Sequence, residues 1–164
     1  MQPIIRTIFG SGILVLFLTI SGTAHSEPPT FQTPAQQAIL MDFDTGAVIY
    51  EKNADSQMFP ASMTKLMTSI LAFDELKAGR LTLDDTFNVS ETAWRKGGSK
   101  MFVKVGDRVS LHDLLRGIIV QSGNDACIVV AEGIAGTEDA FADMMTRRGR
   151  ELGLTNSTFI NSTG

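Results

Sequence analysis

The sequence is poor in the residues that build disulfides and metal centres. It contains one cysteine, Cys127, and two histidines, His25 and His112, among 164 residues. A single cysteine excludes an internal disulfide, and so few thiol and imidazole groups exclude a cysteine-rich or histidine-rich metal framework. We therefore expect a hydrophobic core to stabilise the fold without cross-links, with no metal and no cofactor in the site.

Clusters of basic charge are also missing. The chain has 14 Lys and Arg residues against 18 Asp and Glu, which gives a net charge of −4, and the cations are scattered along the sequence. This balance argues against nucleic acid or an anionic membrane surface as partner. A hydrophobic content of 43% with 20% charged residues is typical of a globular domain. We expect a globular protein that binds a small, neutral or anionic molecule.

The sequence has no apolar run long enough to cross a bilayer. The run from Ile8 to Ile20, about 13 residues, is shorter than the roughly 20 that a spanning helix needs. It follows Arg6 and precedes the small-x-small triplet of residues 24–26, the pattern of a cleaved secretory signal peptide, although an uncleaved anchor helix is the alternative. We predict a signal peptide at 1–26, a Pro-rich leader at 27–37 and a folded domain from 38 to 164. A secreted chain without disulfides fits the bacterial envelope, either the periplasm or the outer face of the cytoplasmic membrane.

The mature chain combines strand and helix patterns. Residues 38–43 and 47–51 predict two strands joined by the turn Asp44-Thr45-Gly46. Helices are predicted at 62–77, with Gly79 after its end, at 110–120, with Ser110 as a capping residue, and at 125–135. A further helix is predicted from the N-cap Thr137 to Gly153. Residues 81–110 are expected to form loops with short elements. We predict an α+β fold in which an antiparallel sheet packs with helices and a helical subdomain is inserted beside it.

The first candidate for chemistry is an S-x-x-K pattern formed by Ser62 and Lys65. At a spacing of three on a helix, both side chains project from one face, so the amine can reach the hydroxyl. Taken alone, the pattern also fits an N-capping serine followed by a solvated lysine. The helix is unusually apolar, however, and we expect it to be buried on nearly all sides. Burial would lower the pKa of Lys65 and suit it to act as a base, while the helix N-terminus would stabilise an alkoxide on Ser62.

The second candidate is Ser122-Gly123-Asn124, which lies between two apolar helical runs. These flanks predict a buried turn. The simpler interpretation makes Asn124 an N-cap and Gly123 a turn residue. A hydroxyl and a carboxamide presented from one tight turn could instead relay a proton and bind a substrate amide, the two further tasks of acyl transfer.

Together, S-x-x-K and the S-x-N that follows 60 residues later resemble the pattern of penicillin-binding proteins and serine β-lactamases. The stretches 61–68, 98–102 and 121–127 are similar to the low-molecular-mass serine D-alanyl-D-alanine carboxypeptidases, and the similarity covers nearly all of the mature chain. The resemblance implies an acyl-enzyme that removes the terminal D-alanine from peptidoglycan stem peptides and that penicillin and other β-lactams inhibit covalently.

The same resemblance implies a role for each matched residue. Ser62 would form the acyl-enzyme, Lys65 would take its proton, and Ser122 would relay a proton to the leaving D-alanine. Asn124 would bind the peptide amide of the substrate. Ser99 would border the substrate site, although a plain flexible loop explains that residue equally well, and Asp125 and Cys127 are expected to be structural.

The sequence departs from the family at one point, because neither K-T-G nor K-S-G occurs anywhere in it. In the family that motif supplies a cation and an oxyanion donor, so we expect this chain to be the N-terminal part of a longer enzyme. The family's peripheral membrane attachment, through an amphipathic C-terminal anchor, would then lie beyond Gly164. A D,D-endopeptidase, a β-lactamase and a non-catalytic cell-wall-binding fragment remain as alternatives.

Overall fold

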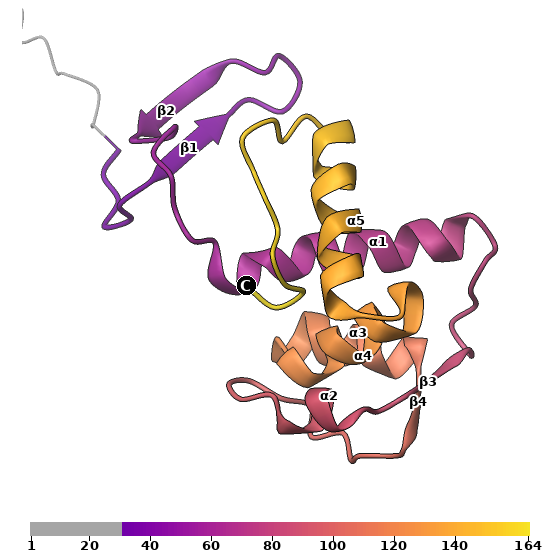
Figure 1. Ribbon diagram of the computed structural model, residues 1–164. Coiled ribbons are helices and arrows are strands. Elements are labelled where there is room, and N and C mark those ends of the chain that lie inside the picture. Colours follow the sequence, from indigo (N-terminus) through magenta and orange to yellow (C-terminus); the bar gives the residue numbers. More distant parts are fainter. Residues whose placement is uncertain (1–30) are drawn as a thin grey trace, which may run out of the picture. The chain divides into compact units, whose positions relative to one another are not determined.

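The computed structural model describes residues 31–164 as two units, one ending at Asp55 and the other running from Ser56 to Gly164 (Figure 1). The predicted signal peptide and the first residues of the leader lie outside the described residues. The elements, in chain order, are β1 (Ala38–Met41), β2 (Val48–Lys52), the 3₁₀ helix η1 (Ala61–Thr64), α1 (Lys65–Lys77), β3 (Thr86–Asn88), α2 (Glu91–Arg95), β4 (Arg108–Ser110), α3 (Leu111–Gln121), α4 (Asn124–Ala135) and α5 (Glu138–Glu151).

The first unit contains the predicted hairpin. Strands β1 and β2 pair antiparallel with a register shift between Leu40 and Met41, and β1 ends at Met41, before the predicted boundary. The Asp42 carboxylate accepts hydrogen bonds from the backbone N–H of Thr45, at 2.8 Å, and from its hydroxyl, at 2.6 Å. Gly46 has a φ of +70°, a conformation that glycine adopts without a steric penalty. The turn chemistry therefore fixes this connection as the sequence predicted.

The second unit is mainly helical, and helix caps that the sequence predicted begin two of its helices. The hydroxyl of Ser110 accepts from the N–H of Asp113 at the start of α3. That of Thr137 accepts from Ala140 at the start of α5, and Gly153, at a φ of +89°, follows the end of that helix. Between α1 and α3, the short strands β3 and β4 pair antiparallel, in a region predicted as loops with short elements.

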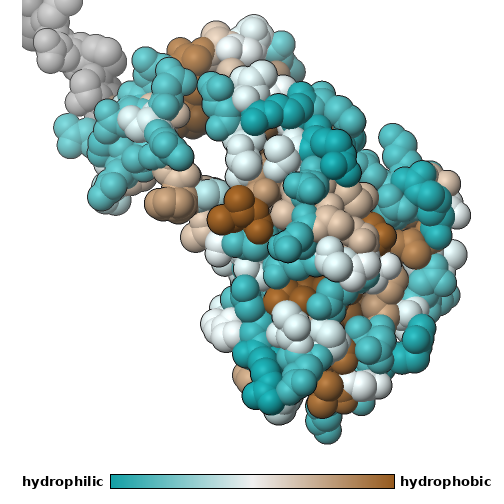
Figure 2. Space-filling model, in the orientation of Figure 1, coloured by the Kyte–Doolittle hydropathy of each residue, from teal (hydrophilic) through white to brown (hydrophobic). Residues whose placement is uncertain are grey.

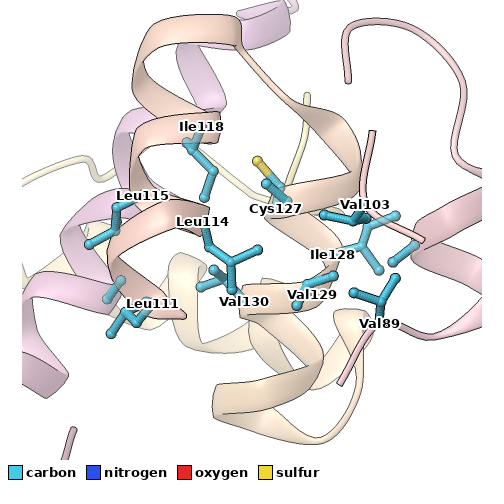
Figure 3. Packing of buried hydrophobic residues seen from close by; sticks show 13 residues of the cluster. Val89, Val103, Leu111, Leu114, Leu115, Ile118, Cys127, Ile128, Val129 and Val130 are labelled. Atoms are coloured by element: carbon cyan, nitrogen blue, oxygen red, sulfur yellow. The ribbon is translucent and has the colours of Figure 1, made fainter. Parts of the chain in front are cut away.

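The core of this unit lies between α3 and α4 and is covered by residues from β3, α2 and the following loop. Figure 3 shows the side chains of Leu114 and Ile118 on α3 lying near those of Cys127 and Val130 on α4. A second, smaller cluster joins α1, α4 and α5 around Phe141, whose side chain is fully buried. Tight burial of these apolar side chains is the main favourable term in the stability of such a unit.

The first long helix is buried on most sides, as predicted, except along one exposed stripe. Met67 and Leu71 are buried, but Met63, Leu66 and Phe73 are 56%, 69% and 47% exposed. Both core clusters of this unit take residues from α1, and within this helix only Leu66, Phe73 and Lys77 are exposed. Figure 2 shows hydrophobic areas, in brown, among hydrophilic residues on the face that it draws.

The last residues of the chain return to the start of α1, as Figure 1 shows beside the label of the C-terminus. The hydroxyl of Thr68 donates to the carbonyl of Ser162 at 2.7 Å. Ser162 is fully buried, and both its N–H, at 2.9 Å, and its hydroxyl, at 2.6 Å, donate to Glu138 on α5. These contacts place the backbone of residues 162–164 against the beginning of α1. Among residues 31–164, no helix is long and apolar enough to span a membrane.

Candidate active site

Ser62 and Lys65 lie on consecutive elements rather than on one helix. Ser62 belongs to η1, and Lys65 is the first residue of α1. Across this junction Lys65 Nζ donates to Ser62 Oγ at 3.0 Å. Ala61, directly before Ser62, has a φ of +47°, which is uncommon for a residue with a Cβ atom and is a form of strain that clusters at functional sites. The junction thus presents a hydroxyl and an amine within hydrogen-bond distance.

The surroundings of Lys65 favour its neutral form. The residue is 4% exposed, and burial lowers the pKa of its amine below the usual lysine value, while the positive charge of Lys96 adds to this effect. Burial also raises the pKa of the neighbouring Cys127 thiol to about 12, so this thiol carries no charge near neutral pH. A carbonyl holds the amine from the other side, since Lys65 Nζ also donates to the Thr163 oxygen at 3.0 Å.

Ser122 faces the same space as the Ser62–Lys65 pair. It forms the C-cap of α3 with a φ of +55°, a left-handed conformation that turns the chain directly into α4. A hollow of about 180 Å³ is lined by residues of η1, α1 and α3 together with this cap: Ser62, Lys65, Leu66, Ser69, Ile118, Ile119 and Ser122. The three residues predicted as catalytic therefore meet in one hollow.

Asn124 and Ser99, predicted to bind substrate, do not line this hollow. Asn124 is the first residue of α4, and its side-chain Nδ2 donates to the Gly97 carbonyl at 2.8 Å. Its backbone N–H donates to the Ser99 carbonyl at 2.7 Å, while the side chain of Ser99 is exposed. The turn Ser122-Gly123-Asn124 was predicted to be buried. Gly123 is buried, whereas Ser122 and Asn124 are only partly buried.

Two contacts of the site were not foreseen from the sequence. The carbonyl of Thr163 meets Lys65 across 98 residues of chain, a separation at which no local pattern predicts an approach. The fully buried carboxylate of Asp125, expected to be structural, accepts hydrogen bonds from the loop that carries Ser99. The position of Asp125 directly after Asn124 was the only available signal.

The arrangement has the parts of a nucleophile and base. A neutral Lys65 amine can accept the Ser62 proton, and the hydroxyl of Ser122 is available to pass a proton to a leaving group. The N–H of Met63 donates to the Pro60 carbonyl at 3.1 Å, so at this helical start the N–H of Ser62 itself is the group that can face a developing oxyanion. Among the described residues, no group of three or more His, Cys, Asp or Glu side chains could hold a metal ion.

Comparison with known proteins finds one family over nearly the whole chain. Residues 22–164 match the family described as D-alanyl-D-alanine carboxypeptidase. D-alanyl-D-alanine carboxypeptidase DacC of Escherichia coli is 43% identical over 159 residues, which cover 92% of this chain and 39% of that protein. A D-alanyl-D-alanine endopeptidase of Pseudomonas aeruginosa is 32% identical, over 93% of this chain and 51% of its own length.

Solved structures agree with the sequence matches. The crystal structure of penicillin binding protein 5 from Haemophilus influenzae superposes with a TM-score of 0.78 at 39% identity, over 84% of this chain and 40% of that one. The fold is therefore the α+β fold of this group of proteins, as predicted. The chain spans about two fifths of the length of such relatives.

Proposed function

The chain belongs to the D-alanyl-D-alanine carboxypeptidase family, and on this basis we propose that it carries the nucleophilic half of a serine carboxypeptidase site acting on peptidoglycan stem peptides that end in D-Ala-D-Ala. The observation that supports the proposal best is the 3.0 Å contact between Ser62 Oγ and the buried amine of Lys65. A solvated lysine amine is charged near neutral pH and cannot act as a base. A desolvated lysine amine has a lower pKa and can accept the proton of the serine hydroxyl.

In the first step, Lys65 takes the proton of the Ser62 hydroxyl, and Ser62 Oγ attacks the carbonyl carbon of the penultimate D-alanine. The C–N bond to the last D-alanine then breaks, and its nitrogen receives the proton from Lys65 by way of Ser122. Water hydrolyses the resulting ester, which releases the shortened peptide as a carboxylic acid and restores the Ser62 hydroxyl.

A β-lactam would follow the first half of this route. Attack of Ser62 on the lactam carbonyl opens the ring C–N bond, but the amine stays tethered to the acyl group, so the leaving group is not lost. Asn124 would bind the amide of either ligand, and Ser99 would border the bound peptide. Such an ester would persist where water cannot displace it.

The predicted signal peptide at 1–26, leader at 27–37 and catalytic part at 38–164 are consistent with export across the bacterial inner membrane. A peptidoglycan substrate lies outside that membrane, so we place the activity in the periplasm or at the outer face of the cytoplasmic membrane. Peripheral attachment to that membrane is part of the same proposal.

The second candidate is a D,D-endopeptidase, favoured by the similarity to the Pseudomonas aeruginosa enzyme. The two candidates can be distinguished with the full-length protein. A carboxypeptidase should release D-alanine from a linear peptide that ends in D-Ala-D-Ala. Faster cleavage of a cross-linked dimer would favour the endopeptidase, and rapid turnover of a β-lactam would identify a β-lactamase. Cleavage of none of the three would indicate a non-catalytic cell-wall-binding protein and refute the proposal.

A further inference from the structure

Asp125 makes an unusual set of contacts for a residue outside the proposed chemistry. Its carboxylate is fully buried. It accepts the backbone N–H of Met101 and that of Phe102, each at 2.9 Å, and that of Val103 at 3.3 Å. Three consecutive N–H groups of a loop thus converge on one anion at the start of α4. Hydrogen bonds to a buried charged group are among the stronger ones in proteins.

The same loop is also fastened by the residue before Asp125. The backbone N–H of Asn124 donates to the Ser99 carbonyl, and Asn124 Nδ2 donates to the Gly97 carbonyl. Two neighbouring residues of α4 therefore hold residues 97–103, one through the loop's N–H groups and the other through its carbonyls. The loop in turn decides how the Asn124 carboxamide points, because only the NH₂ end of an amide can face a carbonyl oxygen.

The loop contains one residue, Phe102, in a backbone conformation that a residue with a Cβ atom does not favour. Phe102 has a φ of +65° although it carries a large side chain, and that side chain is 78% exposed. Gly98 has a φ of +81°, and a Cβ atom there would lie 2.6 Å from Asn124 Nδ2. The strained conformation of Phe102 persists where surrounding contacts enforce it, and here the Asp125 carboxylate accepts a hydrogen bond from the N–H of Phe102 itself.

We propose that Asp125 is a positioning residue of the site, which fixes the loop 97–103 and, through the Gly97 carbonyl, orients the Asn124 carboxamide for the substrate amide. The inference rests on the proposed function. One N–H of the Asn124 NH₂ group is held by the Gly97 carbonyl, which leaves its second N–H to donate to the carbonyl oxygen of the acyl donor's amide. If the loop is released, the carboxamide can rotate, and a share of molecules offers the wrong end to the substrate.

Gly98 and Gly106 provide a matched test that leaves Asp125 intact. Both have a φ near +80°, so an added Cβ atom brings similar backbone strain, but only at Gly98 does it meet the Asn124 side chain. In the full-length protein, we expect Gly98→Ala to lower the second-order rate constant for acylation by a D-Ala-D-Ala peptide roughly tenfold or more, and Gly106→Ala to leave it unchanged. Equal rate constants for the two variants would overturn the inference.

A double-mutant cycle tests whether Asp125 acts through Asn124. Asp125→Asn keeps the shape but turns an NH₂ group toward loop N–H groups, and we expect roughly tenfold slower acylation. In a protein that already carries Asn124→Ala, the same change should alter the rate less than about twofold, because the carboxamide to be oriented is gone. Effects that multiply would show that Asp125 acts independently of Asn124 and would contradict the inference.

The two proposals fail in different ways. Unaltered protein that is never acylated would refute the proposed function, and this inference with it. Normal acylation of the unaltered protein together with an unaffected Gly98→Ala variant would refute the inference alone. Circular dichroism would show whether the Asp125→Asn variant is folded. If it is unfolded, the comparison of Gly98→Ala with Gly106→Ala tests the inference instead.

Discussion

At the scale of single residues, the properties of Lys65 follow from opposing influences on its amine. Burial and the charge of Lys96 favour the neutral form, whereas the Thr163 carbonyl accepts a hydrogen bond that the charged form also makes well. The pKa of Lys65 is lowered, so burial prevails over the stabilising contact. An amine held in this way can keep its hydrogen bond to Thr163 in both protonation states while its proton affinity is reduced.

The effect of the Lys96 charge on the pKa of Lys65 can be tested through the pH dependence of acylation. In Lys96→Gln a neighbouring positive charge is lost, so the pKa of Lys65 rises toward its ordinary value and the neutral amine appears only at higher pH. The limb on which the acylation rate of the full-length protein increases with pH should therefore shift to higher pH. We expect the variant to be acylated more slowly at the lower pH values, where less of its Lys65 amine is neutral, and at an unchanged rate at pH values above the limb.

Lys104→Gln is the control, because Lys104 is exposed and has no resolved influence on Lys65. It should leave the pH profile where it is. A shift of the Lys96→Gln profile to lower pH, or none at all, would contradict the description of Lys65.

The sequence predicted the Ser62–Lys65 approach because a spacing of three joins adjacent turns of a helical segment. That geometry is local, and it survives although Ser62 lies on a 3₁₀ turn and not on the predicted α-helix. The Thr163 carbonyl reaches Lys65 only through the packing of the chain end on α1, which no local pattern encodes. The roles of Ser122 and Asn124 were inferred from the turn that they share and from resemblance, and the role of Ser99 from resemblance alone; all three stay predictions.

At the scale of elements, hydrogen-bonding side chains set where several helices begin. Thr137 precedes α5, which supplies Phe141 and Met145 to the smaller core cluster and Glu138 to the anchor of Ser162. A cap satisfies one of the backbone donors that the first turn leaves without an intrahelical partner. The stability of α5 therefore bears on the segment that touches Lys65.

Removal of this cap should destabilise the protein measurably. Thr137→Ala removes the acceptor of the Ala140 N–H, and we expect the free energy of unfolding to fall by about 1 kcal/mol. Chemical denaturation should show a lower midpoint with an unchanged slope. Thr155→Ala, at an exposed position after the helix, should leave the midpoint unchanged. Identical midpoints for both variants would mean that the cap does not contribute.

Caps and turns were predictable at this scale, and burial was less so. Ser110, Thr137, Gly79 and Gly153 mark helix ends where the sequence placed them, because each supplies a hydrogen bond or a conformation that acts within a few residues. The burial of α1 on most sides was predicted correctly, but its one exposed stripe was not, since an apolar composition does not reveal which face other elements leave uncovered. Leu66, at 69% exposed, is the clearest case.

At the scale of the whole molecule, the α+β class followed from the alternation of strand and helix patterns, and the family followed from two motifs 60 residues apart. The hydrogen bonds by which Asn124 and Asp125 hold the loop 97–103 could not be predicted, because they join α4 to residues more than 20 positions away. The chain contains no K-T-G, and it spans 39% of its Escherichia coli relative.

The most direct test of the account is covalent labelling of Ser62 by penicillin. The full-length protein, incubated with a labelled penicillin and digested, should carry the label on the peptide that contains Ser62, with a mass increase equal to the whole antibiotic because ring opening loses no atoms. Ser62→Ala should abolish the label, whereas Ser56→Ala, at an exposed serine upstream, should keep it. Label that survives in Ser62→Ala would show that another group is the nucleophile and would contradict the central claim.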